Sequence, residues 1–212
     1  MRPSLQDLHD EKKYRKLADF HIDDTMKFLM NPDGYGKEPT KEASKKKQVL
    51  AGLLFFCATA VLGFFVGKTA LTESASGLHI LIALVAFFVI IIPFHEAIHA
   101  IVFKSFKARD VGFGFSPKAG MVYAYAQDYP ISMRELIVVA VMPFAIITPL
   151  LIVSIIVFPQ YATAIGLLLI VHTIACIGDF ALIKYGYQRR NRDIYTYDDL
   201  RNKKRSYFFE KR

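Results

Sequence analysis

The chain has 212 residues, of which 53% are apolar and 22% are charged, with 12 Gly, 9 Pro and 2 Cys. This composition excludes a disordered chain, a collagen-like repeat and a disulfide scaffold, and the length allows one domain with tails. We ascribe the net charge of +8 to topogenic and lipid-binding Lys and Arg rather than to nucleic-acid binding, because the charges gather at the two ends and long apolar runs lie between them.

The first 48 residues are polar and are expected to form a cytoplasmic N-terminal region. Their apolar side chains recur at rough helical spacing among charges and predict a surface amphipathic helix: Leu5, Leu8, Leu17 and Phe20. The stretch NPDGYGKEP at 31–39 is rich in turn-forming residues. Three lysines at 45–47 precede the first apolar run, where they would meet anionic lipid headgroups.

Four apolar runs are each near or above the ~18–20 residues that a membrane-spanning helix needs. They cover about residues 49–66, 78–103, 136–158 and 161–183. No short apolar stretch follows the first Met, so a cleaved signal peptide is not expected. The sequence therefore predicts an all-α membrane protein with about four transmembrane helices, whose membrane domain covers residues 49–184.

The distribution of Lys and Arg predicts the orientation of these helices. Residues 1–48 carry eleven, residues 104–135 carry five and residues 184–212 carry ten, whereas the loop at 67–77 carries one. Basic residues are retained on the cytoplasmic side of a membrane. We therefore expect a multi-pass protein of the plasma (cytoplasmic) membrane, with both termini, the 104–135 loop and a basic tail at 185–212 in the cytoplasm.

The second apolar run contains an H-E-x-x-H motif, formed by His95, Glu96 and His99. On a helix, positions i and i+4 share one face, so both imidazoles can bind one metal ion, for which zinc is the usual choice. The intervening Glu96 can take a proton from a water molecule whose pKa the ion lowers to about 7. The alternative is that the motif only marks a cytoplasmic helix end, with Glu96 reaching the lipid headgroups.

An open catalytic zinc site needs a third protein ligand, and Asp179 in the fourth run is the candidate. His99 lies five residues, about 7.5 Å, before the cytoplasmic end of its span at Lys104, and Asp179 lies five residues before Lys184. The two groups are therefore expected at one depth. A carboxylate there needs a partner, which is either the metal or a basic residue of a loop.

Two further features accompany the predicted site. His172 lies seven residues before Asp179 on the same helical face, where it either assists the site or packs as a hydrogen-bonded core histidine. Pro93 removes a backbone hydrogen bond just before the motif and is expected to bend or loosen that helix.

The loop at 110–129 has a strand pattern that differs from the rest of the chain. Val111, Phe113 and Phe115 alternate, SPKAG gives a turn, and alternation resumes from Val122 to Ala126. This pattern predicts a small cytoplasmic β-hairpin after the second span. Its edge either holds an extended peptide by strand addition or is purely structural.

HEAIHA at 95–100, the following GFGF and the late CIGDF resemble a family of small bacterial membrane proteins named "putative zincin peptidase". It is a domain family of unknown function, distantly similar to the site-2 intramembrane metalloproteases, and the similarity covers about residues 78–185. In site-2 proteases the third ligand is an aspartate of a later span, so the resemblance implies this role for Asp179. Those proteases carry it in an Asn-Pro-Asp-Gly context, whose copy here at 31–34 lies in the polar N-terminal region and is interpreted as a turn.

The sequence thus predicts a zinc-dependent, membrane-embedded peptidase that cleaves a peptide or a membrane protein near the cytoplasmic face. His95, His99 and Asp179 are expected to bind Zn²⁺, and Glu96 to act as general base and then as proton donor to the leaving amine. The alternative function is a non-catalytic metal-binding membrane regulator, a pseudoprotease. A small transporter is a third hypothesis, which the absence of repeat symmetry disfavours. The sequence identifies no substrate-binding residues.

Overall fold

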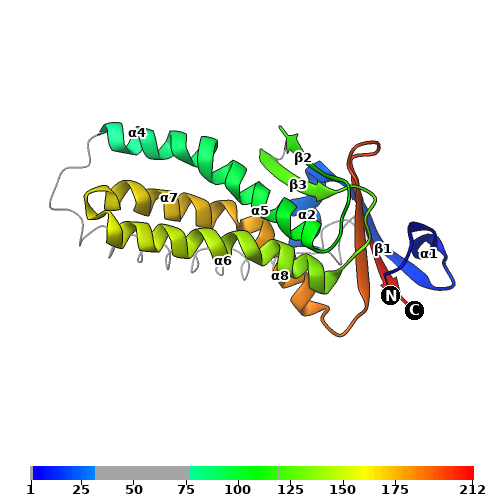
Figure 1. Cartoon of the computed structure of the whole chain (residues 1–212). Helices are drawn as coiled ribbons and strands as arrows, with labels where there is room; N and C mark the ends of the chain where they lie inside the picture. The colour runs from blue at the N-terminus through cyan, green and yellow to red at the C-terminus, as the bar shows by residue number, and fades with distance from the viewer. Residues whose placement is uncertain (1, 32–76, 119) are drawn as a thin grey trace. The chain divides into compact units, whose positions relative to one another are not determined.

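The computed structural model describes residues 2–31, 77–118 and 120–212, and the chain divides into two compact units. The first unit combines Met1–Tyr35, His95–Pro143 and Gly178–Arg212, and the second combines Gly36–Phe94 and Phe144–Ile177. Figure 1 shows the elements in chain order. Two long helices, α5 (Ile92–Ser105) and α6 (Met133–Val157), each contribute residues to both units.

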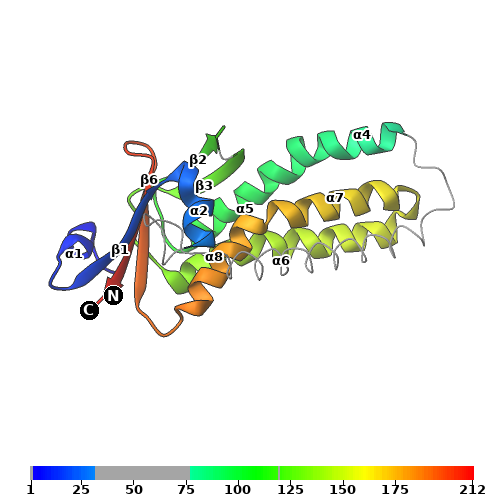
Figure 2. The same ribbon diagram turned by 180° about the vertical axis from the view of Figure 1, so that it is seen from behind.

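An antiparallel sheet of order β1-β6-β5-β4 is the centre of the first unit. Its strands are β1 (Tyr14–His21), β4 (Ile131–Ser132), β5 (Ile194–Asp199) and β6 (Arg205–Lys211). Tyr14 lies opposite Lys211 in the β1–β6 pair, which is seen from behind in Figure 2. The sheet therefore joins the N-terminal segment, the C-terminal segment and the loop between α5 and α6.

Aromatic side chains cover both faces of this sheet. On one face Phe20 stacks on Phe28 and Phe208, with ring centroids 4.4 and 5.7 Å apart. That cluster includes residues of α2 (Thr25–Met30), α6 and α8 (Ile177–Gln188). On the other face the short helix α1 (Leu5–His9) packs on a second cluster: Leu8, Tyr14, Tyr197, Tyr207 and Phe209. Buried aromatic area of this kind is a main source of folding free energy.

A separate hairpin consists of β2 (Val111–Ser116) and β3 (Met121–Ala126), paired antiparallel as the alternating pattern predicts. The rings of Tyr125 and Tyr123 lie across Gly112 and Gly114 on the neighbouring strand. Tyr125 also packs against Leu200 and against Ile22, in the short helix η1 (Ile22–Asp24). The hairpin is thus fixed within the first unit by side chains from both ends of the chain.

The second unit is helical. Helix α4 (Gly77–Ala86) continues into a π-helical segment, η2 (Phe87–Ile91), and both pack against α7 (Ala162–Ala175). A short turn, η3 (Pro159–Tyr161), connects α6 to α7. Pro93 follows the π-helical segment and has no N–H for the carbonyl of Val89. The irregular hydrogen bonding thus lies where this proline predicts it.

The expectation of an all-α protein with about four membrane spans is wrong, because two β-sheets are present. Among the described residues, two helices are long and apolar enough to span a membrane, Ile80–Ser105 and Met133–Val157. A third span would require the broken pair Pro159–Ala175 and Ile177–Gln188 to count as one. The first predicted span, at 49–66, lies outside the described residues.

Both polar ends contain strands that helical spacing did not reveal. Leu5 and Leu8 lie in α1, but Leu17 and Phe20 lie in β1, so the predicted amphipathic helix is replaced by a short helix and a strand. The C-terminal tail contains β5 and β6. A bulge between Lys16 and Ala18 interrupts the alternation of β1, which is why the sequence lacks a regular strand pattern there.

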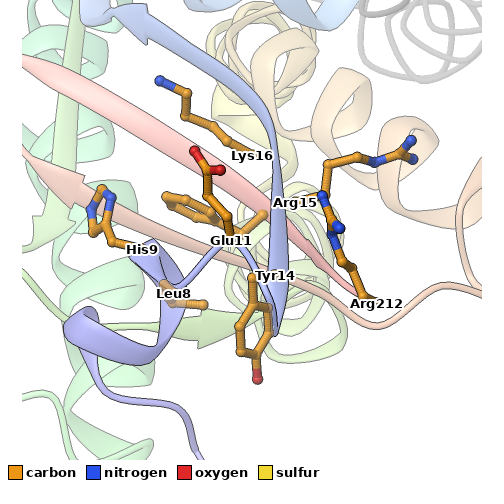
Figure 3. Close-up of a pocket in the computed structure, with 8 residues that line it drawn as sticks. Leu8, His9, Glu11, Tyr14, Arg15, Lys16 and Arg212 are labelled. Atoms are coloured by element: carbon orange, nitrogen blue, oxygen red, sulfur yellow. The ribbon is translucent and has the colours of Figure 1, made fainter.

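A solvent-accessible pocket of about 350 Å³ lies beside α1 and the adjoining ends of β1 and β6. Figure 3 shows its labelled side chains: Leu8, His9, Glu11, Tyr14, Arg15, Lys16 and Arg212. None of the candidate metal or catalytic residues lines it. Arg15 is already paired with Glu210 and Lys16 with Asp19.

Candidate metal centre

The H-E-x-x-H motif lies on α5, and its one-turn spacing places both histidines on the same side of the helix. The rings of His95 and His99 lie edge to face, with centroids 4.8 Å apart and Nε2 atoms 3.1 Å apart. His95, Glu96 and His99 are buried, with 7–8% of their surfaces exposed. Polar side chains this well buried need partners, and their partners come from elements distant in sequence.

Asp179 brings a carboxylate to the two imidazoles from the first turn of α8. Its Oδ2 lies 3.3 Å from His95 Nε2, and its Oδ1 lies 3.5 Å from His99 Nε2. One ligand atom from each of the three residues lies within 4.8 Å of the other two. The structure therefore brings together the three residues that the sequence named as metal ligands.

The main chain of α6 orients one of these rings. His99 Nδ1 lies 2.9 Å from the carbonyl oxygen of Val139, and since a carbonyl only accepts, Nδ1–H is the donor. The residue four positions later is Pro143, which has no N–H to donate back to that carbonyl. The bond leaves the Nε2 lone pair of His99 directed at His95 and Asp179, as in a metal-ligating imidazole.

Glu96 lies next to the cluster and has a different partner. Its Oε2 accepts a hydrogen bond of 2.6 Å from the main-chain N–H of Ala124 in β3. The helical turn directs Glu96 about 100° away from the histidine beside it. The hairpin thus holds this carboxylate at the edge of the three-residue cluster.

The donor set suits zinc in chemistry and in size. Two neutral imidazole nitrogens and one carboxylate are common zinc ligands, with bonds of about 2.0–2.2 Å. A tetrahedral ion with such bonds separates its ligand atoms by roughly 3.3–3.4 Å. The two Nε2 atoms are 3.1 Å apart, and each lies 3.3 or 3.5 Å from a different oxygen of the Asp179 carboxylate. Without a cation or a shared proton, these lone pairs would repel one another at that distance.

The predicted auxiliary residue, His172, belongs to the second unit. It is fully buried in α7, its Nε2 lies 3.6 Å from Cys176 Sγ, and its ring is parallel to that of Phe144. These contacts show that His172 is packed among side chains of its own unit. Its assistance to the metal site stays a prediction.

Asn31, the first residue of the NPDG copy at 31–34, is the C-cap of α2, and the other three lie outside the described residues.

The model of the family described as "putative zincin peptidase" matches residues 87–194, which include the whole H-E-x-x-H motif and Asp179. The chain belongs to this family. The resemblance inferred from the motifs is thereby confirmed.

Searches among curated proteins and among solved structures give no match. Membership in the zincin family assigns the chain to a group of metallopeptidase type, and its long apolar helices indicate association with a membrane. The family match ends within β5, so β6 and the N-terminal strand lie outside the matched region.

Motif reasoning missed two main-chain partners of the site, the Val139 carbonyl and the Ala124 N–H. A signal for the first was present, because a proline in an apolar helix leaves the carbonyl four residues earlier without its helical donor. No local signal marks Ala124, since its contact with Glu96 depends on how the hairpin folds back along α5.

Proposed function

We propose that the protein is a zinc-dependent membrane peptidase of the H-E-x-x-H type. His95, His99 and Asp179 hold the metal, and Glu96 is the general base. The observation that carries the proposal is the convergence of two Nε2 atoms and one carboxylate within 3.1–3.5 Å, beside a buried glutamate. When bound by these residues, zinc would supply Lewis-acid polarisation of a peptide carbonyl and would lower the pKa of water.

Residues of the chain orient the metal ligands and transfer the proton. The Val139 carbonyl keeps His99 in the tautomer whose Nε2 binds metal. Glu96 takes the proton of the attacking water and delivers it to the leaving amine. Since Oε2 accepts the Ala124 amide, Oε1 performs this transfer. The low exposure of the cluster strengthens these electrostatic interactions.

The arrangement of the first unit supports a site near the cytoplasmic face of the plasma membrane. Strands from the N-terminal segment, from the loop between the two candidate spans and from the C-terminal segment form one sheet. Segments of one sheet lie on one side of a bilayer, and these three segments carry most of the Lys and Arg, which favours the cytoplasmic side. A peptide or a membrane protein that reaches this face is the proposed substrate.

Metal analysis and one conservative substitution test the proposal. Purified protein is expected to contain about one zinc per chain, and Asp179→Ala is expected to lose most of it. Glu96→Gln should retain the metal but lose hydrolysis of a casein or membrane-peptide substrate by at least a hundredfold, because an amide cannot accept the proton.

Two outcomes would reject the peptidase. Native protein without metal removes the basis of the proposal. If the wild type contains metal and the Glu96→Gln variant has the same biological activity as the wild type, the non-catalytic regulator is favoured instead.

A further inference from the structure

We propose that Gln127, together with the turn between β5 and β6 at 199–202, is a positioning element that holds the Ala124 amide against Glu96. The catalytic consequence rests on the peptidase function proposed above. The positioning itself is a property of the first unit and can be tested without activity.

Gln127 follows β3 directly and is buried. Its Nε2 donates to Asp199 Oδ1 at 2.9 Å, and its Oε1 accepts from the main-chain N–H groups of Leu200 and Arg201, both at 3.1 Å. One side chain thus satisfies three polar groups of the β5–β6 turn. Buried networks that are fully satisfied are rigid and costly to disturb.

Two main-chain hydrogen bonds and an ion pair fix the same end of the hairpin. The Gln127 N–H donates to the carbonyl of Asp110, just before β2, and the Asp128 N–H donates to the carbonyl of Asp198. The carboxylate of Asp110 forms a two-pronged ion pair with Arg201, with both distances 2.9 Å. Both strands of the hairpin are therefore attached to the β5–β6 turn at their base.

The attachment acts on Glu96 through β3. Ala124 is three residues before Gln127, about 10 Å along an extended strand, and its N–H points out of the hairpin toward Glu96 Oε2 at 2.6 Å. The opposite edge of β3 is occupied by β2. Within the described part of the chain the β2–β3 sheet has two strands, and such hairpins are marginally stable alone. Its position beside α5 therefore depends on contacts such as those of Gln127.

The inference extends the candidate centre beyond the matched part of the chain. The family match ends at residue 194, whereas Asp199, Leu200 and Arg201 all follow it. The C-terminal hairpin is therefore assigned a function in catalysis, through the alignment of the general base rather than through contact with a substrate.

A swapped pair of substitutions tests this inference in the full-length protein. Gln127→Glu places a second carboxylate against Asp199 and should break the attachment of Gln127 to the β5–β6 turn. Adding Asp199→Asn removes the repulsion between the two carboxylates at the net charge of the wild type. Because Asp199 Oδ1 also accepts from Asn202, and Gln127 Nε2 also donates to Asp128, the second substitution restores only part of the network. Arg15→Ala, which breaks an exposed ion pair of the same sheet, is the matched control and should behave as wild type.

For each variant we would measure amide hydrogen exchange at Ala124, the zinc content, and kcat and KM for peptide hydrolysis. Gln127→Glu is expected to accelerate exchange at Ala124 at least tenfold and to lower kcat about ten- to a hundredfold. KM and zinc content should stay within twofold of wild type, since a misplaced catalytic group affects the chemical step. The double variant should recover part of both losses.

Unchanged exchange at Ala124 in Gln127→Glu, or a double variant as impaired as the single one, would overturn the inference. Faster exchange with unchanged kcat would overturn it too. If neither the wild type nor any variant hydrolyses peptides, the proposed function fails. The exchange data alone then decide whether Gln127 holds the Ala124 amide in place. Should Gln127→Glu not fold, Arg201→Ala replaces it, because that side chain is 57% exposed and its loss weakens the same attachment.

Discussion

Main-chain groups orient two of the four side chains in the candidate centre. The Val139 carbonyl receives His99 Nδ1–H, and the Ala124 N–H binds Glu96. Backbone partners fix orientation firmly because they belong to regular elements and have no rotamers of their own. Substitution at Val139 or Ala124 leaves these groups in place, so both contacts depend on the position of the backbone and little on the side chain.

The ionisation of Asp199 is expected to make the free energy of unfolding depend on pH. Burial alone would raise the pKa of this carboxyl, but hydrogen bonds from Gln127 and Asn202 and the charge of Lys203 lower the pKa below its ordinary value. A folded-state pKa below the unfolded one stabilises the fold above the unfolded value of 3.8 and loses that contribution as pH falls further.

We therefore expect the free energy of unfolding to decrease as the pH falls through and below 3.8, with part of the decrease absent in Asp199→Asn. Denaturant titration of detergent-solubilised protein at several pH values measures this. Equal pH slopes for wild type and Asp199→Asn would contradict the assignment.

At the scale of elements, the β2–β3 hairpin depends on two close contacts between glycine and tyrosine. A Cβ at Gly112 would lie 2.7 Å from the ring of Tyr125. That ring cannot move easily, since Tyr125 is buried against Ile22 and Leu200. Because glycine has no side chain, the tyrosine rings can lie flat on the neighbouring strand and cover this face of the hairpin.

Gly112→Ala is expected to destabilise the protein by about 1–3 kcal/mol, the usual cost of overpacking. Gly166→Ala is the control, because a Cβ there meets nothing within 4 Å and alanine favours the helix by up to about 1 kcal/mol. Thermal unfolding of both variants measures the difference. A Tm for Gly112→Ala equal to or above that of wild type would show that the tyrosine ring can move aside.

At the scale of the whole molecule, segments almost 200 residues apart pair in one sheet. Tyr14 lies opposite Lys211, and β4, which precedes α6, pairs with β5. A sheet of this kind requires the segments that contribute to it to be on the same side of the membrane. That this side is the cytoplasmic one stays a prediction from the distribution of basic residues.

Cysteine accessibility tests this topology. In a variant whose two native cysteines are replaced by serine, single cysteines at Glu11, Lys118 and Lys203 are expected to react with a membrane-impermeant maleimide only in inverted vesicles. The cysteine-free variant is the labelling control. Reaction of any of the three in intact cells would contradict a cytoplasmic first unit.

The candidate metal ligands could be predicted from local patterns in the amino-acid sequence, and the structure brings these residues together. The i, i+4 spacing of His95 and His99 is a property of one helix, and the isolated Asp179 stands out because an acid in an apolar run needs a partner. The hairpin was equally visible, since alternation and a turn are local signals. For the same reason the family could be recognised from short motifs.

The four-stranded sheet and the main-chain contacts that support the candidate site could not be predicted from the sequence. The strands at the two ends are short, partly charged and in one case bulged, so their pairing is stabilised by contacts between distant segments and leaves little local trace. The bonds of Gln127 to the β5–β6 turn and of Ala124 to Glu96 likewise join residues 28 or more positions apart. Such contacts are selected by the packing of the complete chain, because a main-chain donor or a buried amide carries no signal of which distant group it will meet.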